Sequence, residues 1–346
     1  MKQIPCIILL LFISVGCDND EPVQVEPQWK KLGLNGYTIN ELELRGDAIY
    51  AATDGGLYFK KINENTDFTL LGLPDLNIED VVVLSESEIL VSVVDRSFQE
   101  PPALYETQNG GQTWEEIEHN FGGDSGGEPV FDLAVSEGTS PVLYGSGFAV
   151  VARSSDQGRT WQPIWGDWGG FATGVSTVEI CPQTNAVWAG GQGAIENGFL
   201  LYSADESEWT SWTDLVPNPT VVKEIAFEDA DRLFVGFEGA LLRTSDKGNT
   251  WKTVIESDDN RFFFGIALRR DNPDHVFAGG WLKTPDAQPL LLYHTSDGGN
   301  AWKTFSYSSE EFGGIYDMVS ISEAGRERIF LGLYKGGIYE VVVPME

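Results

Sequence analysis

Apolar and polar residues alternate in short segments along nearly the whole chain. Each segment runs through alternating apolar positions, a short polar turn, and an apolar pair that leads into glycine. A period of two is typical of β-strands with one buried face, and no segment shows a sustained helical period. The pattern occurs seven times, at Ile39 to Tyr58, Ile78 to Thr107, Val130 to Ser155, Val175 to Ser203, Val221 to Ser245, Phe262 to Ser296 and Ile315 to Val343. The sequence therefore predicts an all-β chain of seven similar units.

Seven units of four strands each would form a β-propeller, a ring of radial sheets. The seventh copy ends after three strands, close to the C-terminus. The N-terminal segment Trp29-Lys30-Lys31 has the same form as Trp251-Lys252-Thr253, which begins a fourth strand in the fifth copy. We therefore predict a seven-bladed β-propeller closed by the N-terminal strand, because such closure removes an exposed sheet edge. The alternative is six blades with one irregular segment.

An octet that ends in tryptophan recurs between the third and fourth strands of these units. Its clearest copies are Ser154 to Trp161, Thr244 to Trp251 and Thr295 to Trp302; Thr107 to Trp114 is a looser copy, and Tyr202 to Trp209 a decayed one. The closing tryptophans lie 47, 48, 42 and 51 residues apart, a spacing that indicates an array of supersecondary units.

Each residue type in the octet suits a tight turn. An Asp or Asn side chain accepts hydrogen bonds from nearby backbone amides, glycine adopts a positive φ at little cost, and tryptophan packs between neighbouring units. We assign a structural role to Asn109, Trp114, Asp156, Gly158, Trp161, Asp246, Gly248, Trp251, Asp297, Gly299 and Trp302.

The octet resembles the Asp-box, or bacterial neuraminidase repeat, of sialidases, xyloglucan-active hydrolases, sortilin-type receptors and photosystem II stability/assembly-factor-like propellers. The resemblance implies that the octet is a structural turn on the face away from the binding site. The overall resemblance to the assembly-factor-like propellers spans about residues 28 to 344 and implies a protein that binds partner proteins. Those propellers carry an arginine patch on one face. This acidic chain has no obvious equivalent, so the photosynthetic role does not carry over.

The first 27 residues are not expected to belong to the propeller. Residues 1–16 read as a signal peptide, because the apolar run Ile7 to Ile13 is too short to span a bilayer. The small residue before Cys17 resembles a lipobox, which implies lipidation of Cys17; ordinary secretion is the alternative. We predict a lipidated flexible tether at 17–27 and the propeller at 28–346, anchored in the cell envelope at the outer membrane or cell surface.

The chain holds 22 basic and 53 acidic residues, for a formal net charge of −31. Such a chain repels nucleic acids and anionic lipids, so we expect no nucleic-acid partner and membrane contact through the lipid anchor only. The sequence contains no phosphate-binding glycine loop, nucleophile elbow or zinc motif. We expect a monomeric propeller without a cofactor.

Binding residues are expected on the face opposite the octets, where longer loops lie on a rigid scaffold. The candidates from these loops are Trp165, Asp167, Trp168, Phe171, Arg261, Trp281 and Phe312. The aromatic residues could stack on a sugar or hold a peptide, and packing between blades is an equally good interpretation.

Carboxylates in these loops could bind a cation such as calcium. They are Asp124, Asp167, Asp258, Asp259, Glu310 and Glu311. They form no contiguous calcium-loop pattern, so solvated surface carboxylates are favoured and a metal site stays open.

The resemblance to glycosidases does not extend to their catalytic residues. Sialidases carry an Arg-Ile-Pro motif and an arginine triad, whereas Arg45 is the one arginine before position 96 and is followed by Gly46. Xyloglucan-active hydrolases of this class use two propeller domains, and this chain can build one. The sequence thus favours a non-catalytic protein that binds an envelope protein or glycan. The alternative is a divergent glycoside hydrolase with two carboxylates in one pocket, and a third interpretation is a structural subunit with a flat apolar patch.

Overall fold

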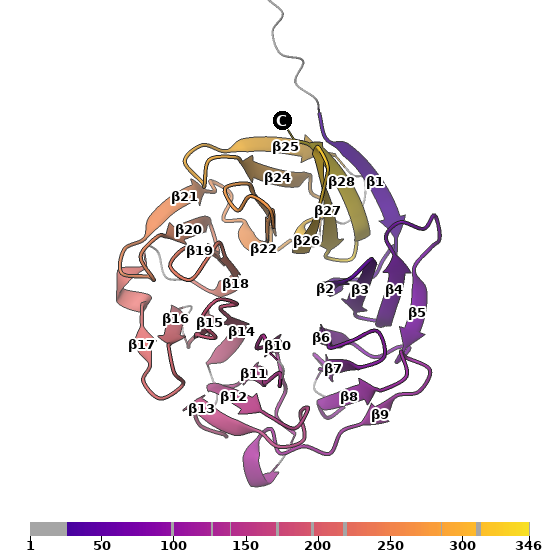
Figure 1. Ribbon diagram of the computed structural model, residues 1–346, viewed down its shortest axis with the longest axis vertical. Coiled ribbons are helices and arrows are strands. Elements are labelled where there is room, and N and C mark those ends of the chain that lie inside the picture. The colour runs from indigo at the N-terminus through magenta and orange to yellow at the C-terminus, as the bar shows by residue number, and fades with distance from the viewer. Residues whose placement is uncertain are drawn as a thin grey trace, which may run out of the picture.

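The computed structural model describes residues 26–345, apart from 98–99, 126, 139, 171–172, 195–196, 217–219, 285 and 309–312. The predicted signal peptide, Cys17 and all but the end of the predicted tether lie outside the described residues. The described chain forms seven four-stranded antiparallel sheets around a central channel (Figure 1). The prediction of an all-β, seven-bladed propeller is confirmed.

Blades are numbered here in chain order. Blade one contains β2 (Ile39–Arg45), β3 (Ala48–Thr53), β4 (Gly56–Lys61) and β5 (Thr69–Gly72), and blade two contains β6 (Ile78–Val83), β7 (Ile89–Val93), β8 (Ala103–Thr107) and β9 (Glu115–Glu116). Blade three contains β10 (Asp132–Val135), β11 (Leu143–Gly147), β12 (Val150–Ser154) and β13 (Gln162–Gly166), and blade four contains β14 (Gly174–Ile180), β15 (Val187–Gln192), β16 (Gly198–Ser203) and β17 (Thr210–Ser211).

Blade five contains β18 (Val222–Phe227), β19 (Leu233–Phe237), β20 (Ala240–Thr244) and β21 (Lys252–Glu256), and blade six contains β22 (Phe262–Leu268), β23 (Val276–Trp281), β24 (Leu290–Thr295) and β25 (Lys303–Tyr307). Blade seven contains β26 (Ile315–Glu323), β27 (Arg326–Leu333), β28 (Gly337–Pro344) and β1 (Gln28–Gly33). Two short 3-10 helices, η1 (Gly123–Ser125) and η2 (Thr213–Leu215), lie in the connections.

The N-terminal strand closes the ring. β1 pairs antiparallel with β28, with Gln28 opposite Val342 and Lys31 opposite Tyr339. Trp29 also stacks on Tyr307 of blade six, with ring centroids 5.1 Å apart. Ring closure is therefore confirmed, and the six-blade alternative is wrong.

The hydrophobic core is divided among the interfaces between blades. Each of the seven buried clusters joins residues of two neighbouring sheets. The sheets approach so closely that a Cβ on Gly332 of β27 would lie 2.7 Å from the side chain of Ile39 in blade one. The ring is a continuous apolar layer that rigidly positions its inner strands.

The octets form the predicted turns. In blade three, Asp156 Oδ1 accepts hydrogen bonds from the Ser154 hydroxyl and the Thr160 amide, both at 2.8 Å, and Oδ2 accepts one from the Thr160 hydroxyl at 2.6 Å. Gly158 has a φ of 86°. Trp161 is buried and packs edge-on against Phe121, with ring centroids 5.3 Å apart. Such local bonds fix the turn between the third and fourth strands.

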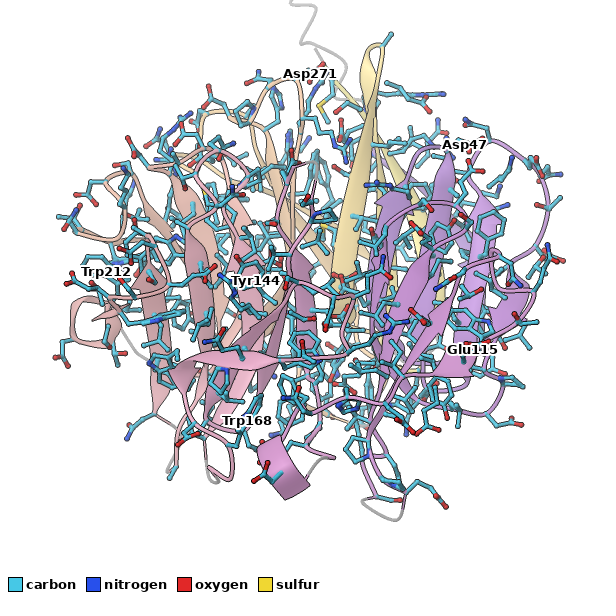
Figure 2. The ribbon with its side chains drawn as sticks, turned by 60° about the horizontal axis from the view of Figure 1, so that its bottom comes forward. Asp47, Glu115, Tyr144, Trp168, Trp212 and Asp271 are labelled. Carbon is cyan, nitrogen blue, oxygen red and sulfur yellow. The ribbon has the colours of Figure 1, made fainter. Side chains whose placement is uncertain are left out.

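The octets lie on the face opposite the blade-to-blade crossings. Backbone amides of the octets donate hydrogen bonds to backbone carbonyls in the turns between first and second strands. The Lys247 amide donates to the Asp231 carbonyl at 2.9 Å, and the Gly298 amide donates to the Asp274 carbonyl at 3.0 Å. In Figure 2 the turns that carry Asp47 and Asp271 lie at the opposite end of the strands from Trp168. The faces are arranged as the strand order predicts.

Candidate functional site

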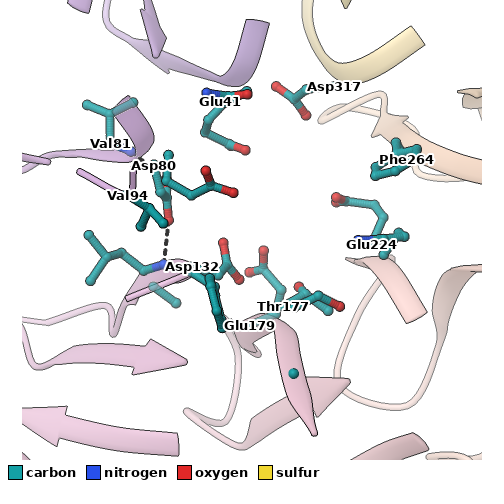
Figure 3. Close-up of a pocket in the computed structure, with 18 of the residues that line it drawn as sticks. Glu41, Asp80, Val81, Val94, Asp132, Thr177, Glu179, Glu224, Phe264 and Asp317 are labelled. Atoms are coloured by element: carbon teal, nitrogen blue, oxygen red, sulfur yellow. Dashed lines mark hydrogen bonds between the residues drawn. The ribbon is translucent and has the colours of Figure 1, made fainter. Parts of the chain in front are cut away.

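The inner strands surround a cavity of about 640 Å³ in the central channel (Figure 3). Its wall includes Val94 and Phe148 from connections between second and third strands, Gln192 at the end of β15, and Gly174, where a crossing enters β14. The wall also includes Val135 and Ile180, the last residues of β10 and β14, so the cavity runs along the channel from the octet side to the crossing face. This is the loop-rich face on which the sequence predicts binding.

A β-bulge near the start of six inner strands shapes the mouth of this cavity. The register shifts by one residue in β2, β6, β14, β18, β22 and β26. A bulge turns the side chain of its extra residue in a new direction. The extra residues all line the channel, and we call them the mouth ring: Asn40, Glu79, Ser176, Lys223, Phe264 and Tyr316.

A second set of side chains lies deeper and is strongly acidic. It consists of six of the eight carboxylates that line the cavity, one from each of six inner strands, and Figure 3 shows them directed into its interior. We call them the channel carboxylates: Glu41, Asp80, Asp132, Glu179, Glu224 and Asp317.

The three aspartates of this set also hold adjacent blades together. Asp317 Oδ2 accepts a hydrogen bond from the Leu42 amide at 2.6 Å, and Asp132 Oδ2 accepts one from the Val178 amide at 2.6 Å. Asp80 Oδ2 accepts one from the Leu133 amide. Each bond crosses from one blade to the next, so these aspartates have a structural role.

Glu41 and Glu224 lack such support. Neither carboxylate accepts a hydrogen bond from another residue that the structure describes, and both side chains are half-buried. Burial raises the pKa of Glu41 well above its usual range, and the charges of Asp317 and Asp80 raise it further. Burial also raises the pKa of Glu224, followed by the charge of Glu179.

The mouth carries aromatic and basic groups. Phe264 and Tyr316 stack with ring centroids 4.5 Å apart, and Trp281 packs against both at 6.1 and 5.5 Å. The Lys223 ammonium lies 5.2 Å from the Phe264 ring centroid. Burial lowers the pKa of Lys223 to about 8, with a further lowering from the charge of Arg96.

Arg96 is held at the mouth by a bidentate pair with Glu79. Its Nε and terminal nitrogen lie 3.2 and 2.7 Å from the two carboxylate oxygens of Glu79. The Arg96 side chain remains about half exposed, at 53%. The rim thus presents a fixed guanidinium beside the aromatic wall.

The structure brings few of the predicted site residues together. Trp281 belongs to the aromatic wall. Trp165 stacks on Phe199 of the next blade at 5.9 Å, and Trp168 packs on Phe121 at 4.9 Å, which favours the packing interpretation for both. Phe171 and Phe312 lie outside the described residues.

Arg261 and Asp167 are also separate from the channel. Arg261 is 1% exposed and donates to the Gly280 carbonyl at 3.2 Å and to Gln288 at 3.3 Å, so it anchors the segment after β23. Asp167 is exposed and accepts the Trp168 amide at 2.8 Å. These placements favour structural roles.

Sequence reasoning missed the channel carboxylates. A signal for most of them exists, since an apolar residue stands two positions before the acid and another directly after it. This applies to Ile39-Asn40-Glu41-Leu42, Ile78-Glu79-Asp80-Val81, Val130-Phe131-Asp132-Leu133, Val222-Lys223-Glu224-Ile225 and Ile315-Tyr316-Asp317-Met318. Aligning the seven units at the start of each inner strand would have revealed the ring.

The described residues contain no group of three or more His, Cys, Asp or Glu side chains arranged to hold a metal ion. The same part of the chain has no helix long and apolar enough to cross a membrane.

Comparison with known proteins finds similarity to assembly factors. Residues 201–341 match the family described as photosynthesis system II assembly factor YCF48. The chain is similar to assembly-factor propellers. It is 27% identical over 138 residues to the photosystem II stability/assembly factor HCF136 of Oryza sativa subsp. japonica, which covers 38% of this chain and 31% of that protein. The chain thus matches about a third of the length of this relative, and the resemblance predicted from the Asp-boxes is confirmed.

Solved structures with the same fold include a binding protein and an enzyme. YCF48 bound to D1 peptide has a TM-score of 0.64 and 17% identity, with coverage of 93% of this chain and 98% of that one. The GH74 xyloglucanase from Xanthomonas campestris has a TM-score of 0.66 and 16% identity, with coverage of 91% and 53%. At these identities the likeness shows the fold alone.

Proposed function

We propose that this protein is a non-catalytic, lipid-anchored propeller of the cell envelope that binds a segment of a partner protein at its channel mouth. The observation that carries the proposal is the mouth itself, where Phe264, Tyr316 and Trp281 form an aromatic wall beside a cavity of about 640 Å³. Aromatic and arginine side chains supply most of the energy at protein interfaces. The bound peptide of YCF48 supports a protein ligand over a glycan.

Site-specific photo-crosslinking in the native envelope tests this proposal. A photoreactive phenylalanine analogue at position 316 should capture one defined protein, which mass spectrometry identifies. The same analogue at position 70 is the control, because Leu70 is a large apolar side chain on the outer strand β5 and is 42% exposed. Equal capture at the two positions, or none at position 316, would contradict binding at the mouth.

Substitution gives a quantitative second measurement. Tyr316→Ala should weaken affinity for the captured protein by about tenfold or more, as loss of about 2 kcal/mol at an interface hot spot implies. Leu70→Ala should leave affinity unchanged. Retention of an envelope glycan together with its cleavage would instead favour the hydrolase alternative.

The lipid anchor is tested separately. Cys17→Ala in the full chain should shift the protein from the membrane fraction to the soluble envelope fraction. Unchanged membrane association of this variant would contradict lipidation at Cys17.

A further inference from the structure

The interior of the channel and its mouth have opposite chemical character. The cavity wall contains eight carboxylates and two basic side chains, Arg96 and Lys223. Arg96 is already paired with Glu79. Below the mouth, every charged group that faces the cavity from the inner strands is a carboxylate: Glu41 and Glu43 of β2, Asp80 of β6, Asp132 of β10, Glu179 of β14, Glu224 of β18 and Asp317 of β26.

Two of these carboxylates are available to a ligand. Each aspartate accepts a hydrogen bond from a backbone amide of the next blade. Glu43 Oε2 accepts one from the Val83 amide at 2.6 Å, and Glu179 accepts one from the backbone amide of Ile180. Glu41 and Glu224, from blades one and five, accept no hydrogen bond from the described residues and point into the cavity (Figure 3). A buried carboxylate without a donor is costly, and a cationic donor removes that cost.

We propose that the channel receives the cationic side chain of a lysine or arginine from the protein partner, with Glu41 and Glu224 as its principal acceptors. This inference rests on the proposed function and names the chemistry that the partner must supply. An aromatic mouth above carboxylates suits such a side chain, since its aliphatic stem packs on rings while its charged end reaches the acids. Because the described residues offer no metal-ligand group, an organic cation fits the cavity better than a bare metal ion.

Proton linkage follows from the same geometry. Burial raises the pKa of Glu41, Glu179 and Glu224 well above their usual range, and carboxylate neighbours add to the rise. A bound cation favours the ionised form, so binding releases protons. Affinity for the cation should therefore increase as pH rises, and loss of charge on Lys223, whose pKa burial lowers to about 8, should increase it further. Lys223, Arg96 and Tyr316 are the other titratable groups at the mouth, besides Glu79.

Short capped peptides test the inference directly. The probes are Ala-Ala-Lys-Ala-Ala and its arginine, glutamine and glutamate counterparts, with spermidine and calcium chloride as further arms. Titrations followed by NMR or calorimetry should show binding of the lysine and arginine peptides at least about tenfold tighter than the glutamine peptide, a difference of about 1.4 kcal/mol. Spermidine should compete with the lysine peptide, because it carries the same charged group.

Substitutions at the neighbouring residues Glu224 and Lys223 provide the matched control, because one removes a negative charge and the other a positive charge. Glu224→Gln and Glu41→Gln should each weaken the lysine peptide by about tenfold, and Lys223→Gln should not weaken it, because it removes a positive charge from the next residue. Circular dichroism checks that each variant is folded. Equal weakening by Glu224→Gln and Lys223→Gln, preference for calcium, or no peptide binding up to about 10 mM would overturn the inference.

The two proposals fail in different ways. If crosslinking at position 316 captures a partner whose affinity Glu41→Gln and Glu224→Gln leave unchanged, the channel inference is wrong and the proposed function stands. If basic peptides bind but no partner is captured, the proposed function fails while the channel chemistry stands.

Discussion

Substitution of Glu43 by glutamine should make the protein more stable at alkaline pH and leave it unchanged at acidic pH. Glu43 lies on β2, and its Oε2 accepts the Val83 amide of blade two at 2.6 Å. Burial raises the pKa of Glu43 from 4.5 to about 7, against the opposing effects of this hydrogen bond and of Arg45. Glutamine keeps an oxygen for the Val83 amide and removes the charge.

The direction and the magnitude of this change in the free energy of unfolding follow from proton linkage. Between pH 4.5 and 7 the native state holds a proton that the unfolded chain has lost, so the free energy of unfolding falls as pH rises. At 1.36 kcal/mol per pKa unit, a rise from 4.5 to about 7 corresponds to about 3 kcal/mol. The Glu43 side chain is only half-buried, so solvent screening reduces this value, and we expect Glu43→Gln to gain about 1 to 2 kcal/mol at pH 8 and almost nothing at pH 4.5.

Urea unfolding of soluble protein beginning at Glu21, followed by tryptophan fluorescence at several pH values, measures this difference. Glu115→Gln, an exposed carboxylate on β9, is the matched control and should show no pH-dependent gain. A stability difference that is the same at pH 5 and pH 8, or that is larger at pH 5, would refute the reasoning.

Three further outcomes test the fold. Asp156→Ala should destabilise the protein by about 2 kcal/mol through loss of three hydrogen bonds, whereas Asp156→Asn should cost less than about 1 kcal/mol. The smaller cost is expected because Asn109 already serves in the octet of blade two, where its Nδ2 donates to the Thr113 hydroxyl at 2.8 Å; equal costs in urea unfolding would contradict this. Trp29→Ala should lower the free energy of unfolding by about 2 kcal/mol, because it removes packing that holds the closing strand β1. It should also promote association in size-exclusion chromatography, and an unchanged melting temperature would argue against closure by β1. Cys181 is 1% exposed, so its thiol should react with Ellman's reagent only on unfolding, and rapid reaction of the native protein would contradict its burial.

The sequence by itself predicted the blade and the number of blades. An octet such as Ser154 to Trp161 carries its own hydrogen-bond partners within eight residues, so its turn depends on local chemistry alone. The alternation along each strand is also local, because it records which face of a sheet is buried. The tryptophan pattern at Trp29 was enough to predict ring closure, since it matches the fourth strands of other units.

The candidate site was decided by the tertiary structure. Glu41 and Glu224 stand far apart in the sequence, and each looks like an ordinary polar position on a strand. They become a pair of acceptors because a bulge precedes each one and because the closed ring turns their strands toward one axis. Trp165 and Trp168 are the opposite case, because the sequence marked them as binding candidates and the tertiary structure uses them for packing. Whether Trp168 meets a ligand or Phe121 depends on the path of a distant crossing, which local pattern does not contain.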